Sequence, residues 1–203
     1  SSLSTYVLVS AGPDRRALIS TYRYIVMGTV GATFYLIGVG FLYMVTGTLN
    51  TADLAARVGQ VEDIRLVLVA AGFVSVGLAV KAAVFPLHAW MPNAYTFAPN
   101  AVTVFIAAAS TKVSLYVLMR VDYAIFQNSI ANHDIQLTLF LVPLGVLALF
   151  VGSLLAIYEK NLKTLLAYSS VAQIGYIALG MAMTSVAGLT GAIVHMFNHG
   201  LIK

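Results

Sequence analysis

The sequence contains no cysteine and few charged residues. Because none of its 203 residues is cysteine, a disulfide framework, thiolate metal sites and cysteine-ligated iron–sulfur clusters are excluded. Charged residues make up 9% of the chain, whereas soluble domains carry about 25%. Hydrophobic residues make up 60%, and the mean hydropathy is +0.91. These values predict an integral membrane protein, because a single soluble core cannot enclose so much apolar surface.

Acidic residues are absent from the centre of every long apolar run. The seven acids lie in polar connections or at the ends of runs: Asp14, Asp53, Glu62, Asp63, Asp122, Asp134 and Glu159. A buried lysine that must hold a proton usually has a carboxylate beside it. We therefore expect an acidic partner on a helix outside this chain. The net charge of +4 is modest and its basic residues gather in connections, which argues against nucleic-acid binding.

The apolar runs predict an all-α, polytopic bundle. A crossing needs about 20 apolar residues at 1.5 Å each. We expect five full or nearly full crossings: one at 24–47, about two between 66 and 119, one at 137–158 and one at 164–183. A partial crossing at 2–11 precedes them, and a last helix runs from a turn at 185–188 to Lys203. Residues 1–203 are expected to be one membrane domain, cut from a longer protein.

The basic connections predict an orientation in the membrane. If the crossings alternate, the connections at 13–23 and 159–163 share one side, with five Lys/Arg against three on the other side. Lysine and arginine favour the cytoplasmic side, so these two connections are expected there. Lys163 and Glu159 belong to the second connection and are expected to be solvated.

Three prolines predict a broken helix. Pro86, Pro92 and Pro99 lie within fourteen residues, and each lacks a backbone donor and clashes with the preceding helical turn. A break at membrane depth is tolerated only against protein or a water-filled cavity. His88 lies inside this break together with Trp90 and Asn93. It could relay protons, or it could lie near a membrane interface with Trp90 as an anchor.

Two lysines lie deep within apolar runs. Lys81 is roughly 22 Å along a helix from Arg65, and Lys112 about 12 Å from Arg120. Snorkelling to an interface is the alternative. A charged side chain at the bilayer centre costs about 2.5–3.5 kcal/mol on insertion scales, so we expect both to face protein or trapped water. A buried lysine can exist as ammonium or as amine, which suits a proton path.

Three basic residues near the end of the chain recur every four residues. His195, His199 and Lys203 therefore form one helical stripe that rises about 12 Å. They could simply be hydrogen-bonded polar groups of a core. The two histidines could chelate zinc, but no carboxylate is near in the sequence and a lysine follows one turn later. We expect no metal or other cofactor. Other aromatic residues are taken as interface belt and core: Tyr22, Tyr24, Phe41 and Tyr43.

Three segments resemble a known family. The run KAAVFPLHAWMPNAY at 81–95 resembles the broken-helix signature of the proton-conducting antiporter-like subunits. Respiratory complex I, the Mrp cation/proton antiporters and membrane-bound hydrogenases share these subunits. LAYSSVAQIGY at 166–176 and HMFNHGLIK at 195–203 are similar to the family's next hallmark and its central relay helix. Within the family, 99–120 and 47–57 are most similar to the MrpD type of antiporter subunit.

The resemblance implies a fold of about fourteen helices in two inverted repeats, of which this chain would run from near the fifth helix into the eleventh. It assigns proton-relay positions to Lys81, Lys112, His195, His199 and Lys203. The family's fifth-helix glutamate would precede Ser1, and its twelfth-helix lysine or glutamate would follow Lys203. The chain alone is therefore not expected to transport.

The implied parent is a proton-translocating subunit of a multisubunit Na⁺/H⁺ antiporter in the bacterial inner membrane. Its partners would be protons, monovalent cations, lipid and other membrane subunits. A proton-pumping subunit of an NADH-quinone oxidoreductase or membrane-bound hydrogenase is the alternative. A third alternative is a passive scaffold or a haem-binding membrane subunit, although haem histidines usually come from facing helices.

Overall fold

The computed structural model describes residues 2–61, 64–126 and 137–203, and this part of the chain is helical without strands. Within it, five helical segments are long and apolar enough to cross a membrane: Arg15–Thr46, Ile64–Ala82, Asn100–Phe126, Phe140–Tyr158 and Leu162–Ala182. Two shorter helices, α1 (Ser2–Ser10) and α11 (Val186–Ile202), lie at the two ends. The predicted all-α membrane bundle is confirmed.

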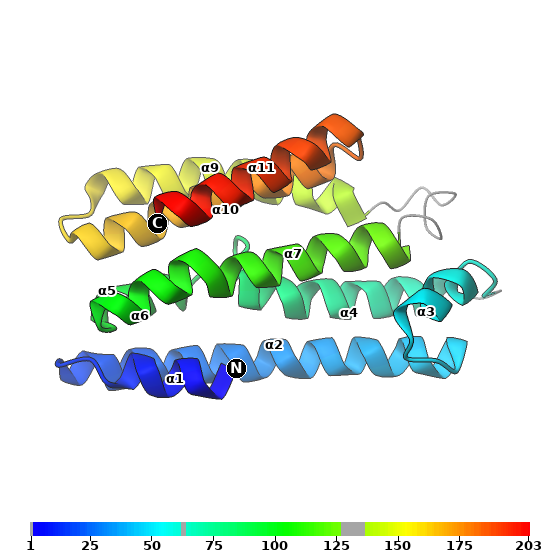
Figure 1. Cartoon of the computed structure of the whole chain (residues 1–203), viewed down its shortest axis with the longest axis horizontal. Helices are drawn as coiled ribbons and strands as arrows, with labels where there is room; N and C mark the ends of the chain where they lie inside the picture. Colours follow the sequence, from blue (N-terminus) through cyan, green and yellow to red (C-terminus); the bar gives the residue numbers. More distant parts are fainter. Residues whose placement is uncertain (1, 62–63, 127–136) are drawn as a thin grey trace.

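The helices lie side by side along one axis (Figure 1). Helix α2 (Arg15–Thr46) packs on α4 (Ile64–Ala82), and α9 (Leu137–Tyr158) packs on α10 (Leu162–Ala182), which also contacts α11. Helix α7 (Thr111–Val121) packs on α4, in the middle of the view between the other two groups. The short helix α3 (Thr51–Val58) covers the end of α2.

Side-chain caps fix where the helices begin. The Asp14 carboxylate accepts a hydrogen bond from the Arg16 amide at 3.0 Å before α2, and the Asn161 side chain accepts one from the Lys163 amide at 3.0 Å before α10. Ser185 caps α11 in the same way. Such caps satisfy backbone donors that a helix leaves free in its first turn, so the connections end at these polar residues.

The predicted break follows α4 and is confirmed. Residues 83–90 are not helical, Ala83 takes a left-handed φ of 57°, and α5 (Met91–Phe97) then resumes with a proline in its first turn. Pro99 occupies the position before α6 (Asn100–Phe105), where its missing amide costs no helical hydrogen bond. The prolines thus separate three helices.

The next crossing is longer and less regular than predicted. A helix was expected over 101–119, but it continues to Phe126 through two π-helical segments, η1 (Ile106–Ser110) and η2 (Asp122–Phe126). Asp122 consequently lies within the helical crossing, rather than in the connection where it was expected. Mid-helix π segments often occur at functional sites, and Lys112 is the second residue after η1.

Helices α2 and α4 approach closely where Gly31 of α2 faces Gly77 of α4. A Cβ at Gly77 would lie 2.6 Å from both the Gly31 carbonyl oxygen and the Tyr35 nitrogen, whereas a Cβ at Gly72 would meet nothing within 4 Å. We therefore expect Gly77→Ala to lower the free energy of unfolding by about 1–3 kcal/mol, because backbone must move apart. Gly72→Ala on the same helix should be neutral or slightly stabilising.

The measurement is the thermal unfolding midpoint of the two full-length variants in the same detergent. Because both changes are glycine to alanine in α4, helix propensity is matched and the difference reports helix packing alone. Equal midpoints for the two variants would contradict this close contact between α2 and α4.

Candidate functional site

Lys81 lies in the last turn of α4 against two tyrosine rings. Its Nζ is 5.3 Å from the ring centroid of Tyr6 on α1 and 5.3 Å from that of Tyr24 on α2. Tyr24 was expected in the interface belt or the core; it is buried, and it stacks on Trp90 with centroids 4.5 Å apart. Trp90 is itself buried, which removes the expectation that it anchors an interface.

A cavity with hydroxyl groups borders Lys81. It has a volume of about 390 Å³, and its polar lining comes from α1, η1 and α7: Ser4, Thr5, Ser110 and Ser114. A water molecule takes up about 30 Å³ in the liquid, so the cavity has room for several waters with hydroxyl partners. It extends from Lys81 to the helical turns on either side of Lys112.

Lys112 is 7% exposed and lies at the start of α7. Its ammonium donates to the carbonyl oxygen of Ala107, and Thr111 Oγ1 is 3.5 Å from Nζ. Ala107 belongs to η1, and the Thr111 hydroxyl also donates to its carbonyl at 3.3 Å. The π segment therefore supplies the carbonyl that accepts from Lys112, the neighbouring Thr111 on α7 supplies the hydroxyl, and the lysine side chain is buried.

Helix α11 brings its histidines against this segment. A Cβ at Gly200 would lie 3.4 Å from the Ala108 carbonyl oxygen, so α11 and η1 are in contact. His199 is buried, and neither ring nitrogen has a hydrogen-bond partner within the described part of the chain. Two of the predicted relay positions therefore lie on neighbouring elements: His199 is on α11, and Lys112 is the second residue after η1.

His195 has different surroundings from His199. Its Nε2 is 2.6 Å from Gln173 Oε1 on α10, and the two histidine rings are nearly parallel with centroids 6.5 Å apart. The predicted stripe on one helix face is therefore present. Within the described residues, no group of three or more histidine, cysteine, aspartate or glutamate side chains could hold a metal ion.

Lys203 and Lys163 line a second cavity, whose walls are mainly apolar. Lys203 Nζ donates to the Leu166 carbonyl oxygen at 2.9 Å, and Lys163 Nζ donates to the Ala98 carbonyl oxygen at 2.8 Å. The cavity has a volume of about 170 Å³, and Asn100 and Thr103 add polar groups to it. The expectation that Lys163 is a solvated turn residue is wrong: it is half-buried and reaches the end of α5. Nothing local in the sequence signals this contact.

His88 lies in the break, half-buried, with its ring stacked on Phe85 at a centroid distance of 5.2 Å. Its Nδ1 is buried without a hydrogen-bond partner in the described part of the chain. This geometry is compatible with a relay role and with an interfacial role alike.

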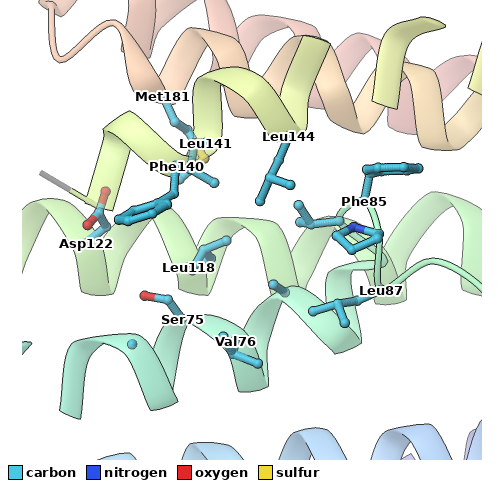
Figure 2. A pocket seen from close by; sticks show the side chains of 14 residues that line it. Ser75, Val76, Phe85, Leu87, Leu118, Asp122, Phe140, Leu141, Leu144 and Met181 are labelled. Carbon is cyan, nitrogen blue, oxygen red and sulfur yellow. The ribbon is translucent and has the colours of Figure 1, made fainter. Parts of the chain in front are cut away.

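A separate cavity of about 340 Å³ lies between α4, α7 and α9 (Figure 2). Its walls are mainly apolar, with Leu118, Phe140 and Leu144 among them, and Asp122 and Ser75 contribute polar groups. Asp122 is thus a carboxylate on a membrane-crossing helix, which sequence reasoning had placed in a connection. It lies in a cavity whose lining does not include the lysines.

The family model for the transmembrane region of "NADH:quinone oxidoreductase/Mrp antiporter" proteins matches residues 1–203. The chain belongs to this family. It is 43% identical over 204 residues to the N subunit of the NADH-quinone oxidoreductase of Desulforudis audaxviator, covering 100% of this chain and 40% of that protein. It is 32% identical over 203 residues to the D subunit of the Na⁺/H⁺ antiporter of Alkalihalophilus pseudofirmus, covering 99% of this chain and 40% of that protein. The chain thus spans about 40% of the length of these curated relatives.

Two solved structures contain a chain with the same fold as this protein. One is the membrane-bound sulfane sulfur reductase, an archaeal respiratory membrane complex, with a TM-score of 0.91 and 35% identity over 99% of this chain and 40% of that one. The other is the Mrp complex of Dietzia sp. DQ12-45-1b, with a TM-score of 0.87 and 33% identity over 98% of this chain and 37% of that one. The predicted resemblance to the antiporter-like family is confirmed.

Proposed function

We propose that this chain is part of a proton-translocating subunit of a multisubunit Na⁺/H⁺ antiporter. The observation that carries the proposal is the placement of two buried basic groups on neighbouring elements: Lys112 lies at the start of α7 next to η1, and His199 lies on α11, which contacts η1. An ammonium is retained at this depth only at a cost, and both groups can gain and lose a proton. The two relatives that are named as D subunits of Na⁺/H⁺ antiporters support the same function.

In the proposed path, a proton on Lys81 moves through waters in the hydroxyl-lined cavity towards Lys112, and from there to His199. Lys203 and His195 continue the path on α11, and Gln173 holds the His195 ring by its hydrogen bond. His88 provides a branch from the break. The expected acidic partner lies on a helix outside this chain. Other membrane subunits complete the assembly, since the structural neighbours belong to multisubunit membrane complexes.

The orientation of the chain is part of this proposal. The connections before α2 and α10 lie at one end of the bundle, and α3 lies at the opposite end (Figure 1). Together with the lysine and arginine excess of the first end, this favours a multi-pass protein of the cell membrane with the connections at 13–23 and 159–163 in the cytoplasm. The cavity with Lys163 and Lys203 would then admit protons from the cytoplasm.

A second candidate is a proton-pumping subunit of an NADH-quinone oxidoreductase. The 43% identity to the N subunit of such an enzyme favours it. The same side chains would move protons, but a redox reaction in other subunits would supply the energy.

The test uses the full-length protein in its native complex, reconstituted in vesicles that contain a pH-sensitive dye. For the antiporter, we expect a sodium gradient alone to drive proton movement, without NADH or quinone. Proton movement that requires NADH and quinone would replace the antiporter by the second candidate. If neither driving force moves protons in an intact complex, proton translocation itself is contradicted.

A further inference from the structure

We infer that Tyr6 and Tyr24 position Lys81 and favour its ammonium form through cation–π contacts, within a buried cluster that also contains Trp90. We call these three residues the aromatic cage. The inference deepens the proposed function and rests on it, because it concerns how the first lysine of the path holds its proton.

The geometry places the ammonium against two ring faces from different helices. Both Nζ-to-centroid distances are 5.3 Å, inside the limit of about 6 Å for an energetically significant contact. The rings of Tyr6 and Tyr24 are perpendicular, with an interplanar angle of 89° and centroids 4.6 Å apart. They therefore flank the ammonium from two directions. Both tyrosines are buried, which makes the attraction stronger than at an exposed site.

The cage is fixed to the backbone that carries Lys81. Trp90 lies nearly parallel to Tyr24, at an angle of 13°, and its indole Nε1 donates to the Val80 carbonyl oxygen at 2.9 Å. Val80 immediately precedes Lys81. The break, which supplies Trp90, therefore connects the second half of the broken helix to the lysine at the end of the first half.

Helix α2 makes room for the Tyr6 ring at one glycine. A Cβ at Gly28 would lie 1.9 Å from the Tyr6 hydroxyl oxygen. Any larger residue at this position would push the ring out of its place beside Lys81. The Tyr6 ring, which contacts the Lys81 ammonium, thus requires a glycine at position 28.

A ring face attracts an ammonium but not a neutral amine, so the cage favours the protonated form of Lys81 without contributing a charge. A carboxylate alone would hold the proton more tightly, and the hydroxyl-lined cavity would then receive it less readily. The aromatic cage and the expected acidic partner can both stabilise the protonated form of Lys81. The alternative explanation is that the rings only fill space in the core.

Ring fluorination distinguishes these two explanations, because it weakens the electrostatic attraction while it changes the ring's size very little. The starting variant is Tyr24→Phe in the full-length protein, which keeps the ring and whose transport rate is the reference for the series. Phenylalanines with one, two and three ring fluorines are then placed at position 24. We expect the transport rate to fall at each step, by about tenfold over the series.

The same fluorinated series at Phe34 is the matched control. Phe34 is also on α2 but pairs with Phe73, at a centroid distance of 5.2 Å, and its series should be flat. A second test compares Gly28→Ala with Gly40→Ala, since a Cβ at Gly40 meets nothing within 4 Å. We expect only Gly28→Ala to reduce transport.

Transport by the Lys81→Ala variant, measured beside these variants, distinguishes a failure of the cage inference from a failure of the proposed proton path. If Lys81→Ala abolishes transport but the series at position 24 is flat, the cage inference is overturned and the proposed path stands. If transport survives Lys81→Ala, the proposed path is overturned, and the cage inference with it. A stepwise fall at position 24 with a flat series at Phe34 supports the inference.

Discussion

Lys112→Met in the full-length protein is expected to lower proton transport by about a hundredfold, the range typical of removing a positioned proton donor or acceptor. Methionine keeps most of the length and flexibility of the side chain and removes only its charge and its proton. Lys112 is buried between η1 and the helices around it, with its ammonium on the Ala107 carbonyl. A proton that leaves the cavity near Lys81 would then have no titratable group at this step.

The same variant should unfold at an equal or higher temperature. Taking an ammonium into an apolar interior costs free energy, and replacing such a group with an apolar one is often neutral or stabilising. A loss of transport without a loss of stability would indicate that the lysine is kept for function. The measurements are dye-reported proton transport in vesicles and thermal unfolding in detergent.

Val117→Met is the matched control for this prediction. Val117 is on the same helix α7, five residues after Lys112, and does not line the cavity beside Lys81, so methionine there should leave transport unchanged. If Lys112→Met, folded and assembled, transports within about twofold of the original, Lys112 is not a relay group.

Local chemistry explains why the helices and the break could be predicted from sequence. Long apolar runs and three closely spaced prolines act through hydration and backbone geometry at the residues themselves, so their positions are readable without a structure. The stripe of His195, His199 and Lys203 follows from helical periodicity alone. In the structure, His195 and His199 lie on α11, Lys203 caps the end of this helix, and Lys112 is buried.

Contacts between distant segments explain what the sequence did not reveal. Tyr24 was expected in the interface belt or the core, and an interface anchor was one of the two roles left open for Trp90, because nothing near them in the sequence shows that α2 and the break converge on Lys81. Lys163 looked solvated, because its partner, the Ala98 carbonyl, is at the end of another helix. The π segments have no clear sequence signature, and η2 extends the crossing past Arg120 to include Asp122.

His199 and His195 have the same helical spacing, but their surroundings differ, and the surroundings of His199 predict the result of replacing it. It is 4% exposed, and both ring nitrogens are without a hydrogen-bond partner among the described residues. His195 lies on the same stripe but has Gln173 as its partner at 2.6 Å. The two histidines should therefore respond differently to the same substitution.

We expect His199→Leu to reduce transport by about a hundredfold and to raise the free energy of unfolding by about 1–3 kcal/mol, because a buried polar group without a partner costs about that much. His195→Leu should not stabilise the protein, since it leaves the Gln173 side chain without its partner. Transport in vesicles and unfolding midpoints of both full-length variants provide the measurements. An unfolding midpoint that falls for His199→Leu would mean that His199 is held by hydrogen bonds from waters or other helices, and unchanged transport would remove it from the path. Only loss of transport together with a gain in stability identifies a histidine retained for carrying protons at the expense of the fold.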